Sequence, residues 1–475
     1  MIEDLRLILP EILLTVFASV GLIVSLFLTA KNRYINQLIS LVGVVLAGAY
    51  CIVDFPDQTV TAFSGQFGVD PLSQGLKIFI LGIMAFILIY ARSYVTSRKI
   101  ESGEFHALFL FSCVGMLLLV SAKSLLMIYL GLELLTLPLY ALVALQKESP
   151  LAVEAGMKYF ALGALASGML LYGMSLLYGF TQSLELSAVT QYLSTSEGNM
   201  LPRVALVFIL IGIAFKFGAA PFHMWIPDIY QGAPTPVTLL IATTPKIAAF
   251  GMAYRLLHDG MPTAMAQTWS PILMVIALLS LAVGNIFALV QTNTKRLLGY
   301  STIAHMGYVF LALMVAPKIG YAPAVYYILT YAIVSLAAFG IIIMLSLSGE
   351  EADKLSDLKG LGVRRPWVAF LMLIVAFSLA GVPPTVGFYA KFTVLTALNN
   401  AGFTWLAAVA VLFSVIGAFY YLKIIRMMYF ETPEQRYLAQ GSVDFRVALS
   451  LNGLAVLGLG IVPAPLFVLC TKLFA

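Results

Sequence analysis

The sequence predicts an all-α polytopic membrane protein, and three observations support this fold class. Apolar residues make up 61% of the 475 residues, and charged residues make up only 10%, whereas soluble domains carry roughly 25% charged residues. Apolar runs of about 20 residues recur from one end of the chain to the other, and each is long enough to cross a ~30 Å hydrocarbon core as a helix. Only short polar stretches separate the runs, so we expect residues 1–475 to form a single membrane domain.

Polar residues, prolines and glycines divide the apolar runs into about fourteen expected transmembrane helices. The expected helix starts lie near Leu7, Ile35, Ser73, His106, Lys123, Glu154, Pro202, Pro236, Ser270, Leu297, Tyr321, Pro366, Phe403 and Phe445. The N-terminal segment lacks the cationic stretch of a signal peptide, so we expect the first helix to remain uncleaved.

The basic residues between the apolar runs predict the orientation. With the N-terminus outside, about fifteen cations fall in inner loops and about six in outer loops, which fits the positive-inside rule. The inner set is Lys31, Arg33, Arg92, Arg98, Lys99, Lys147, Lys295, Arg296, Lys354, Lys359, Arg364, Arg365, Arg426, Arg436 and Arg446, and the outer set is Arg6, Lys123, Arg203, Arg255, Lys318 and Lys472. An even number of helices then places both termini on the outer side.

Charge and cysteine usage exclude several functions. The net charge is +5, but the basic residues are spread over short loops, so we expect no nucleic-acid partner. The three cysteines, Cys51, Cys113 and Cys470, lie far apart within apolar segments. None forms a pair with metal-binding spacing, and no haem, iron–sulfur or zinc signature is visible.

A carboxylate and three lysines lie deep within apolar runs. Glu133 is about ten residues into its helix, which places it roughly 15 Å along the axis and near mid-membrane. Lys216 is followed by Pro221, which ends the regular helix and leaves free backbone carbonyls. Lys246 lies near the middle of the next run, and Lys391 belongs to a run that prolines and glycines interrupt. The alternative for each is a structural ion pair or a lysine that reaches an interface.

Three further residues have two interpretations each. Lys158 is one turn into its helix and either takes part in proton transfer or extends its side chain to the inner interface. His305 lies in a polar stretch and is either a proton relay or a neutral, hydrogen-bonded core residue. Lys77 lies close to a helix start, which favours an interfacial position.

The energetic cost of these charges favours a functional interpretation. An ion at a helix centre costs about 2.5–3.5 kcal/mol. With Lys158 counted beside the three deep lysines, four lysines and one glutamate would cost roughly 12–17 kcal/mol before compensation. One carboxylate cannot neutralise four ammonium groups. Because desolvation favours the neutral amine, we expect some of these lysines to gain and lose protons, with their charge set by neighbouring ions.

A weak internal repeat is also present. Lys123-Ser-Leu-Leu aligns with Lys295-Arg-Leu-Leu, and in this register Glu133 falls on His305. Inverted repeats are common in transporters, which place their sites near the repeat interface.

Several motifs carry a family resemblance. The stretch Phe215-Lys-Phe-Gly-Ala-Ala-Pro-Phe-His-Met-Trp-Ile-Pro-Asp228 resembles the hallmark of the proton-translocating family shared by respiratory complex I and multisubunit cation/proton antiporters. The continuation Ile229-Tyr-Gln-Gly-Ala-Pro-Thr-Pro-Val-Thr238 is similar to the N-type branch of the bacterial complex I subunits. Further matches are Tyr129-Leu-Gly-Leu-Glu-Leu-Leu-Thr-Leu-Pro138, Gln291-Thr-Asn-Thr-Lys-Arg-Leu-Leu-Gly-Tyr-Ser301 and Leu379-Ala-Gly-Val-Pro-Pro-Thr385.

The resemblance implies a fold of fourteen helices with two inverted five-helix repeats and discontinuous helices. Three N-terminal helices would occupy residues 1–105, the repeats 106–260 and 268–430, and a last helix 440–475. It also implies roles for five residues: Glu133 pairs with Lys216, Lys246 is the central proton carrier, His305 is a neighbouring relay, and Lys391 is the terminal group toward the next subunit.

The resemblance also implies the setting. The chain would carry no cofactor, because flavin and iron–sulfur clusters belong to partner subunits. Its partners would be other membrane-arm subunits, with an antiporter-like M-type neighbour on one side and small A-, J- or K-type subunits on the other, together with membrane lipid. The location would be the bacterial inner membrane. Two other functions remain open: a subunit of a multisubunit sodium/proton antiporter, and a structural subunit whose buried charges only hold helices in register.

Overall fold

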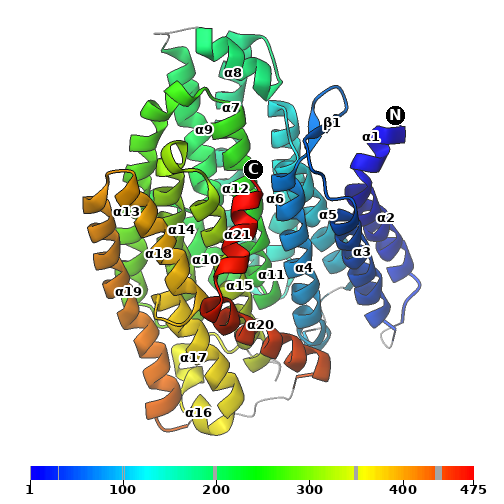
Figure 1. The fold of residues 1–475 in the computed structure, drawn as a ribbon. Coiled ribbons are helices and arrows are strands. Elements are labelled where there is room, and N and C mark those ends of the chain that lie inside the picture. The colour runs from blue at the N-terminus through cyan, green and yellow to red at the C-terminus, as the bar shows by residue number, and fades with distance from the viewer. Residues whose placement is uncertain are drawn as a thin grey trace.

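The protein is a helical bundle, seen in a computed structural model that describes residues 2–29, 32–98, 100, 102–195, 200–346, 351–433 and 441–474 (Figure 1). Within these residues, eleven helices are long and apolar enough to cross a membrane, and Leu9–Ser25 and Pro366–Ala380 are shorter apolar helices. The predicted all-α membrane class is therefore confirmed. Of the cations used to predict the orientation, Lys31, Lys99 and Arg436 lie outside the described residues.

The elements follow one another in this order. The α-helices and strands are α1 Ile2–Leu7, α2 Leu9–Ser25, α3 Tyr34–Val53, β1 Val60–Ala62, β2 Phe67–Val69, α4 Pro71–Ser97, α5 Ser102–Val120, α6 Leu125–Val143, α7 Pro150–Thr181, α8 Leu186–Thr195, α9 Leu201–Phe217, α10 Trp225–Gly232, α11 Thr235–Ala242, α12 Thr244–Tyr254, α13 Ala266–Leu289, α14 Thr294–Ile319, α15 Ala322–Leu345, α16 Leu361–Arg364, α17 Pro366–Ala380, α18 Val386–Asn400, α19 Thr404–Phe430, α20 Val443–Ile461 and α21 Ala464–Lys472. A π-helical turn, Arg255–Asp259, and 3₁₀ turns at Thr263–Met265 and Leu355–Leu358 complete the list.

Each of the fourteen expected helix starts lies within four residues of an observed one. The structure adds elements that apolar runs do not predict, such as the β1–β2 hairpin and the short α8. It also divides the last segment into α20 and α21, which turn sharply against each other in Figure 1. The division falls at Pro463, which cannot donate the backbone hydrogen bond that would continue α20.

Two membrane helices are interrupted in the same way. α9 ends at Gly218 with φ of +71°, and α17 ends at Gly381 with φ of +86°. This left-handed conformation is open to glycine at little cost and ends each helix abruptly. The chain resumes as α10 and as α18. The two breaks leave backbone carbonyls without the partners that a continuous helix would supply. The expected discontinuous helices are thus observed, whereas the two inverted repeats remain a prediction.

The bundle has two ends, which we name by their contents. The hairpin face carries the β1–β2 hairpin and α8, at the top of Figure 1. The cation-rich face carries loop 290–293 and the segment 351–360, which meet where the backbone N–H of Thr294 donates to the carbonyl of Asp353. α16 and the end of α19 also lie at the cation-rich face, at the bottom of Figure 1.

A buried ionic cluster fastens the hairpin face. Arg255 is 1% exposed and bonds Asp70 at 2.8 Å and Asp259 at 3.0 Å. Lys123 contacts the same two carboxylates at 3.1 and 3.0 Å. Burial alone would raise the pKa of Asp70, but Arg255, Lys123 and the N–H of Ser73 lower it to about 2. The cluster joins the start of α4, the end of α5 and the end of α12.

We expect Asp70→Asn to destabilise the folded chain by about 3 kcal/mol near neutral pH, because it leaves a buried guanidinium short of one partner. The ordinary pKa of aspartate is about 3.9, so the stabilisation by the Asp70 charge is present above about pH 4 and is lost as the pH falls through about 2. Thermal denaturation of the wild-type and variant chains at several pH values measures this. A difference in stability that stays constant down to pH 2 would contradict the assignment.

Candidate functional site

The first helix break binds a lysine from another helix. The ammonium group of Lys246, on α12, donates to the carbonyl of Lys216 at 3.1 Å and to that of Phe217 at 2.8 Å. These are the last two residues of α9, whose carbonyls the break leaves free. The C-terminal end of a helix carries a partial negative charge, which stabilises a cation placed there. The backbone of the broken helix therefore provides the site for Lys246, which is fully buried.

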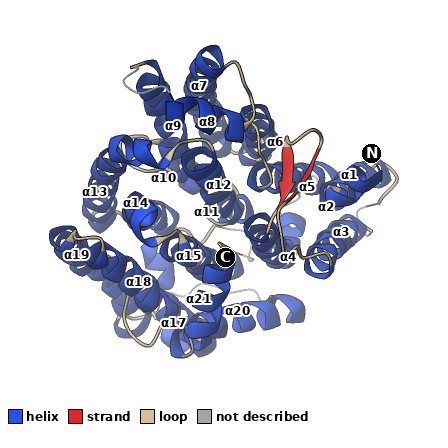
Figure 2. Cartoon of the chain, turned by 45° about the horizontal axis from the view of Figure 1, so that its top comes forward, coloured by secondary structure: helices blue, strands red, loops and turns tan. Residues whose placement is uncertain are grey.

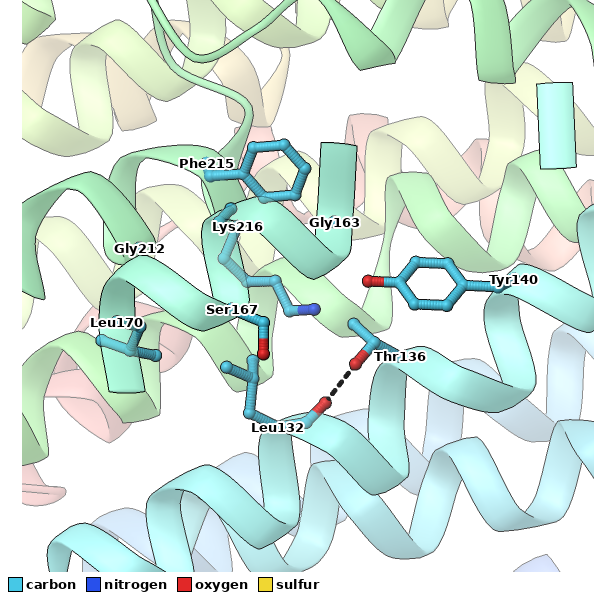
Figure 3. A pocket seen from close by; sticks show the side chains of 10 residues that line it. Leu132, Thr136, Tyr140, Gly163, Ser167, Leu170, Gly212, Phe215 and Lys216 are labelled. Atoms are coloured by element: carbon cyan, nitrogen blue, oxygen red, sulfur yellow. Dashed lines mark hydrogen bonds between the residues drawn. The ribbon is translucent and has the colours of Figure 1, made fainter. Parts of the chain in front are cut away.

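The side chain of Lys216 points the other way, into a small cavity between α6, α7 and α9. Figure 3 shows its ammonium group directed at the space bordered by Thr136, Tyr140 and Ser167. The hydroxyl of Ser167 donates to a carboxylate oxygen of Glu133. Lys216 and Glu133 thus both lie next to Ser167, but within the described residues no direct ion pair joins them, so their pairing stays a prediction.

The cavity beside Lys216 and Ser167 is large enough for a single water molecule. The cavity has a volume of about 20 Å³, and a water molecule needs about 10–15 Å³ together with two or more polar partners. The hydroxyls of Thr136, Tyr140 and Ser167 and the ammonium of Lys216 line this space. The arrangement can therefore connect Lys216 to Glu133 by one bridging water and Ser167, a short path over which a proton can move.

Glu133 itself lies on an outward side of α6. It is half-buried, and its helix neighbours Leu130 and Leu137 are 50% and 54% exposed. A carboxylate at this depth is costly unless it is paired. The side of α6 that carries it therefore suits contact with a neighbouring polar group better than contact with lipid.

Aromatic rings lie near the ammonium group of Lys246. The ammonium of Lys246 lies 4.9 Å from the ring centroid of Trp225. Trp225 donates from Nε1 to the carbonyl of Phe215 at 3.1 Å and stacks on Tyr159 with ring centroids 5.0 Å apart. A cation over a tryptophan face is stabilised in the absence of water. Trp225 begins α10, so its position depends on the break that binds Lys246.

The second break repeats the chemistry. Lys391, on α18, donates to the carbonyls of Leu379 and Ala380 at 3.1 and 2.8 Å, which are the last turn of α17. It also donates to the hydroxyl of Ser414 at 2.9 Å and lies 5.4 Å from the ring centroid of Tyr308. Lys391 is buried, and no carboxylate among the described residues pairs with it. Both halves of the chain thus hold a lysine on the carbonyls of a broken helix.

His305 joins a hydrogen-bonded group of tyrosines. Its Nδ1 lies 2.7 Å from the hydroxyl of Tyr327, and its Nε2 lies 3.2 Å from that of Tyr421. A cavity of about 10 Å³ is lined by both His305 and Lys391, which is near the lower limit for one water molecule. The structure therefore brings His305 next to Lys391, whereas its expected role as a relay beside Lys246 stays a prediction.

The two halves are joined by polar contacts such as the one from the N–H of Ala220 to the hydroxyl of Ser280 at 2.8 Å. No hydrogen bond between described residues joins Lys246 to His305. Near the α9 break, α9 and α14 contact each other through the rings of Phe217 and Phe310, whose centroids are 5.2 Å apart. The predicted row is thus two groups: Glu133, Lys216 and Lys246 in one, and His305 and Lys391 in the other.

Lys158 belongs to neither group. It lies at the cation-rich face, 44% exposed, where it bonds Glu154 and Asp228, both at 2.8 Å. Asp228 also bonds Arg296 at 2.6 Å. These four residues line an open cavity of about 200 Å³. The neighbouring Tyr159 stacks on Trp225, whose ring contacts Lys246, whereas Lys158 itself makes its ion pairs at the surface.

Sequence reasoning missed two more carboxylates with partners on other helices, of which the first is buried and the second half-buried. Glu11 on α2 is 2% exposed and bonds the fully buried Lys77 at 2.7 Å, so Glu133 is not the only carboxylate buried in a helix and Lys77 is not interfacial. Glu11 directly follows Pro10 at the start of an apolar run, a position that also suits a solvent-exposed helix start, so spacing could not reveal its partner.

The second, Glu351, lies in a connection at the cation-rich face. It accepts hydrogen bonds from Tyr94 and, at 2.8 Å, from Thr235. Burial alone would raise the pKa of Glu351, but the charge of Lys295 and the hydroxyl of Tyr94 are among the contacts that lower it. Lys295 donates to the carbonyl of Ala233 at 2.9 Å. Glu351 and Lys295 thus fix the start of α11, which leads to Lys246.

The fold and the site define a class: polytopic membrane proteins that hold titratable groups on broken helices. Residues 122–417 match the family described as NADH:quinone oxidoreductase/Mrp antiporter, TM. This match covers more than half of the chain. The chain belongs to this family.

Curated relatives extend over nearly the whole chain. NADH-quinone oxidoreductase subunit N of Thiobacillus denitrificans is 48% identical over 98% of this chain and 96% of the relative. The protein of the same name from Nitrosomonas europaea is 48% identical over 96% of this chain and 94% of the relative. These matches include the three N-terminal helices and the C-terminal helices that lie outside the family match.

Solved structures share the fold. A chain of respiratory complex I from Thermus thermophilus is 33% identical, with a TM-score of 0.83 and coverage of 96% of this chain and 98% of that one. A chain of the Mrp complex from Dietzia sp. is 21% identical, with a TM-score of 0.82 and coverage of 98% and 96%. At the lower identity the likeness concerns the fold alone.

We expect Gly381→Ala to weaken the Lys391 site. A Cβ there would lie 2.8 Å from Cδ of Lys391, and the left-handed backbone costs an alanine about 1–2 kcal/mol. The ammonium should therefore leave its carbonyls, and quinone reduction coupled to proton transfer by the assembled complex should fall. Gly82→Ala is the matched control, because nothing lies within 4 Å of a Cβ on Gly82. Equal activity of the two variants would contradict the role of the break.

Proposed function

We propose that the chain moves protons across the membrane through Glu133, Lys216, Lys246, His305 and Lys391, without redox chemistry of its own. It is a proton-translocating membrane subunit of the NADH:quinone oxidoreductase type, as its relatives, its family and its similarity to a complex I chain support. Flavin and iron–sulfur clusters are assigned to partner subunits, which would reduce quinone and supply the driving energy as a change in electrostatics.

The main support for the proposal is that the last residues of α9 make two different contacts. One residue, Lys216, places its side chain in the cavity lined by Ser167, the hydrogen-bond partner of Glu133, and its backbone carbonyl accepts from Lys246. A change of charge at Glu133 acts on the Lys216 ammonium across one water-sized space. A movement of Lys216 then shifts the carbonyls that hold Lys246.

The chemistry at the two lysines follows from their environment. Carbonyl oxygens and a tryptophan face stabilise the ammonium form of Lys246, whereas complete burial favours the neutral amine. The balance is set by the positions of two carbonyls, so a small displacement of the α9 end changes the proton affinity of Lys246. Lys391 is held by the same kind of site and exchanges protons with His305 through the cavity that both line.

The lack of a hydrogen bond between Lys246 and His305, among the described residues, implies that the two groups of titratable residues interact through their charges. Because no hydrogen bond between described residues joins Lys246 to His305, a proton on one half acts on the other through its field unless water enters. Two positive charges repel strongly at short range in a low dielectric. Protonation of one half therefore favours release of a proton from the other.

The partners and the location follow from the same assignment. The outward position of Glu133 fits a charge-bearing subunit against α6, which we assign to the small A-, J- or K-type subunits. Lys391 lies beside α19, which we assign to the side of the antiporter-like M-type neighbour. We place the chain in the bacterial inner membrane, with the cation-rich face and Lys158 toward the cytoplasm and both termini outside.

The proposed role of Lys158 in proton transfer is limited to the surface of the protein. Its charged cavity lies at the cation-rich face, and the neighbouring Tyr159 stacks on Trp225, whose ring contacts Lys246. We propose that this cavity collects protons for the first half and that the stack limits their passage.

We expect Glu133→Gln and Lys216→Met each to lower coupled quinone reductase activity by about tenfold, equivalent to about 1.4 kcal/mol. Both remove a titratable group from the path while keeping its approximate size. Proton uptake by vesicles and quinone reduction by the assembled complex are the measurements.

Lys318→Met is the control, because Lys318 is an exposed lysine that lies over the ring of Phe403 and should leave activity unchanged. If the buried charges only held helices together, both site variants would instead reduce assembly while proton transfer per assembled complex stayed normal. That result would reject the proposed path.

A further inference from the structure

A hydrogen-bonded chain of hydroxyl groups extends from His305 toward the cation-rich face. The hydroxyl of Tyr421 contacts His305 Nε2 and also the hydroxyl of Ser301. Tyr420 lies beside it, and its hydroxyl donates either to Tyr421 or to the amide oxygen of Asn285, each at 3.2 Å. All of these side chains are buried.

Several of the residues around this hydrogen-bonded group lie on one side of α19. Ser414, Gly417, Tyr420 and Tyr421 recur at the spacing of one helix face, and this face packs on α13. Gly417 permits the close approach, because a Cβ there would lie 2.6 Å from the amide oxygen of Asn285. The opposite side of α19 is apolar and exposed, as Leu412 at 60% and Phe419 at 64% show. The polar groups thus gather only where α19 meets the site.

The positions of Asn285 along α13 and of His305 along α14 show the direction in which the hydrogen-bonded hydroxyl groups extend. Asn285 is four residues from the end of α13 at Leu289, which is about 6 Å along the axis. His305 is eleven residues from the start of α14, about 16 Å. At the surface end, the ammonium of Lys423 lies 3.5 Å from the carbonyl of Gln291 in loop 290–293. The hydroxyl groups therefore cover the distance from mid-membrane to within two helical turns of the cation-rich face.

These groups can pass protons without acquiring charge. A hydroxyl both donates and accepts, so Tyr421 can give its proton to Nε2 of His305 while it receives one from Tyr420, and Tyr420 takes one from a hydronium ion on the side of the cation-rich face, which becomes water. One O–H bond breaks and one forms at each oxygen, and one N–H bond forms on His305. Tyr420 has two acceptors at the same distance, which provides the two orientations that a hydroxyl needs to transfer a proton and then reset.

We propose that Tyr421 and Tyr420, with Ser301 and Asn285, form a proton-uptake branch that supplies His305 from the cation-rich face. The second half of the molecule then draws protons by a route of its own, separate from the Lys158 cavity of the first half. The proposal rests on the proton-translocating function given above and adds the residues by which this half is supplied.

A structural role for the same bonds has a different consequence. Hydrogen bonds between membrane helices contribute about 0.6 kcal/mol each on average, so loss of one hydroxyl would lower stability slightly and leave proton transfer intact. Tyr326 provides the matched comparison. It is fully buried, and its hydroxyl has no hydrogen-bond partner among the described residues, so Tyr326→Phe removes a buried hydroxyl outside the branch.

The test compares Tyr421→Phe and Tyr420→Phe with Tyr326→Phe in the assembled complex. We expect Tyr421→Phe to lower coupled quinone reduction by at least about tenfold, as loss of a proton-transfer group does, and to enlarge the solvent deuterium isotope effect, because proton supply becomes limiting. Tyr420→Phe should act in the same direction. Rates and isotope effects equal to those of Tyr326→Phe would overturn the branch.

Ser301→Ala keeps the test informative if a tyrosine variant fails to assemble. It removes one hydroxyl without creating a large void, and it should also enlarge the isotope effect. Glu133→Gln distinguishes a failure of the proposed branch from a failure of the proposed function. If Glu133→Gln lowers coupled activity as expected and the branch variants behave like Tyr326→Phe, only the branch is wrong. If Glu133→Gln is also normal, the proposed function fails.

Discussion

The buried lysines of this chain depend on one interaction, the binding of an ammonium group by the free carbonyls at the end of a broken helix. Lys246 is held by the end of α9 and Lys391 by the end of α17. A continuous helix would have used these carbonyls in its own hydrogen bonds. The glycines that end the helices are therefore as necessary to the site as the lysines, because they make a cation site in a region that has almost no anions.

This arrangement explains how an excess of lysine over carboxylate is tolerated. A partial negative charge stabilises an ammonium less than a carboxylate does, so these sites favour the charged lysine less strongly than an ion pair would. Full ion pairs occur elsewhere in the chain, in the Asp70 cluster at the hairpin face and between Glu11 and Lys77. The molecule thus uses complete pairs where it needs rigidity and incomplete ones along the proposed proton path.

Apolar runs and breaker residues predicted the helix starts and both interruptions, because these depend on local chemistry. The partners of the buried charges could not be predicted in the same way. Lys246 binds a helix end about 30 residues earlier in the chain, and Glu11 meets Lys77 across two helices. For Lys158 the sequence left two interpretations open, and its exposed ion pairs with Glu154 and Asp228 agree with the interfacial one. Spacing along one helix does not contain this information, because it arises where helices pack.

The most direct measurement is the number of protons translocated per quinone reduced by the complex in vesicles, with Lys246 replaced by methionine. Methionine keeps the length and apolar stem of the side chain and removes the ammonium that the α9 carbonyls hold. The account predicts an assembled complex in which the coupled rate falls and the protons carried by this chain are missing from the ratio. An assembled Lys246→Met complex with an unchanged rate and an unchanged ratio would contradict it.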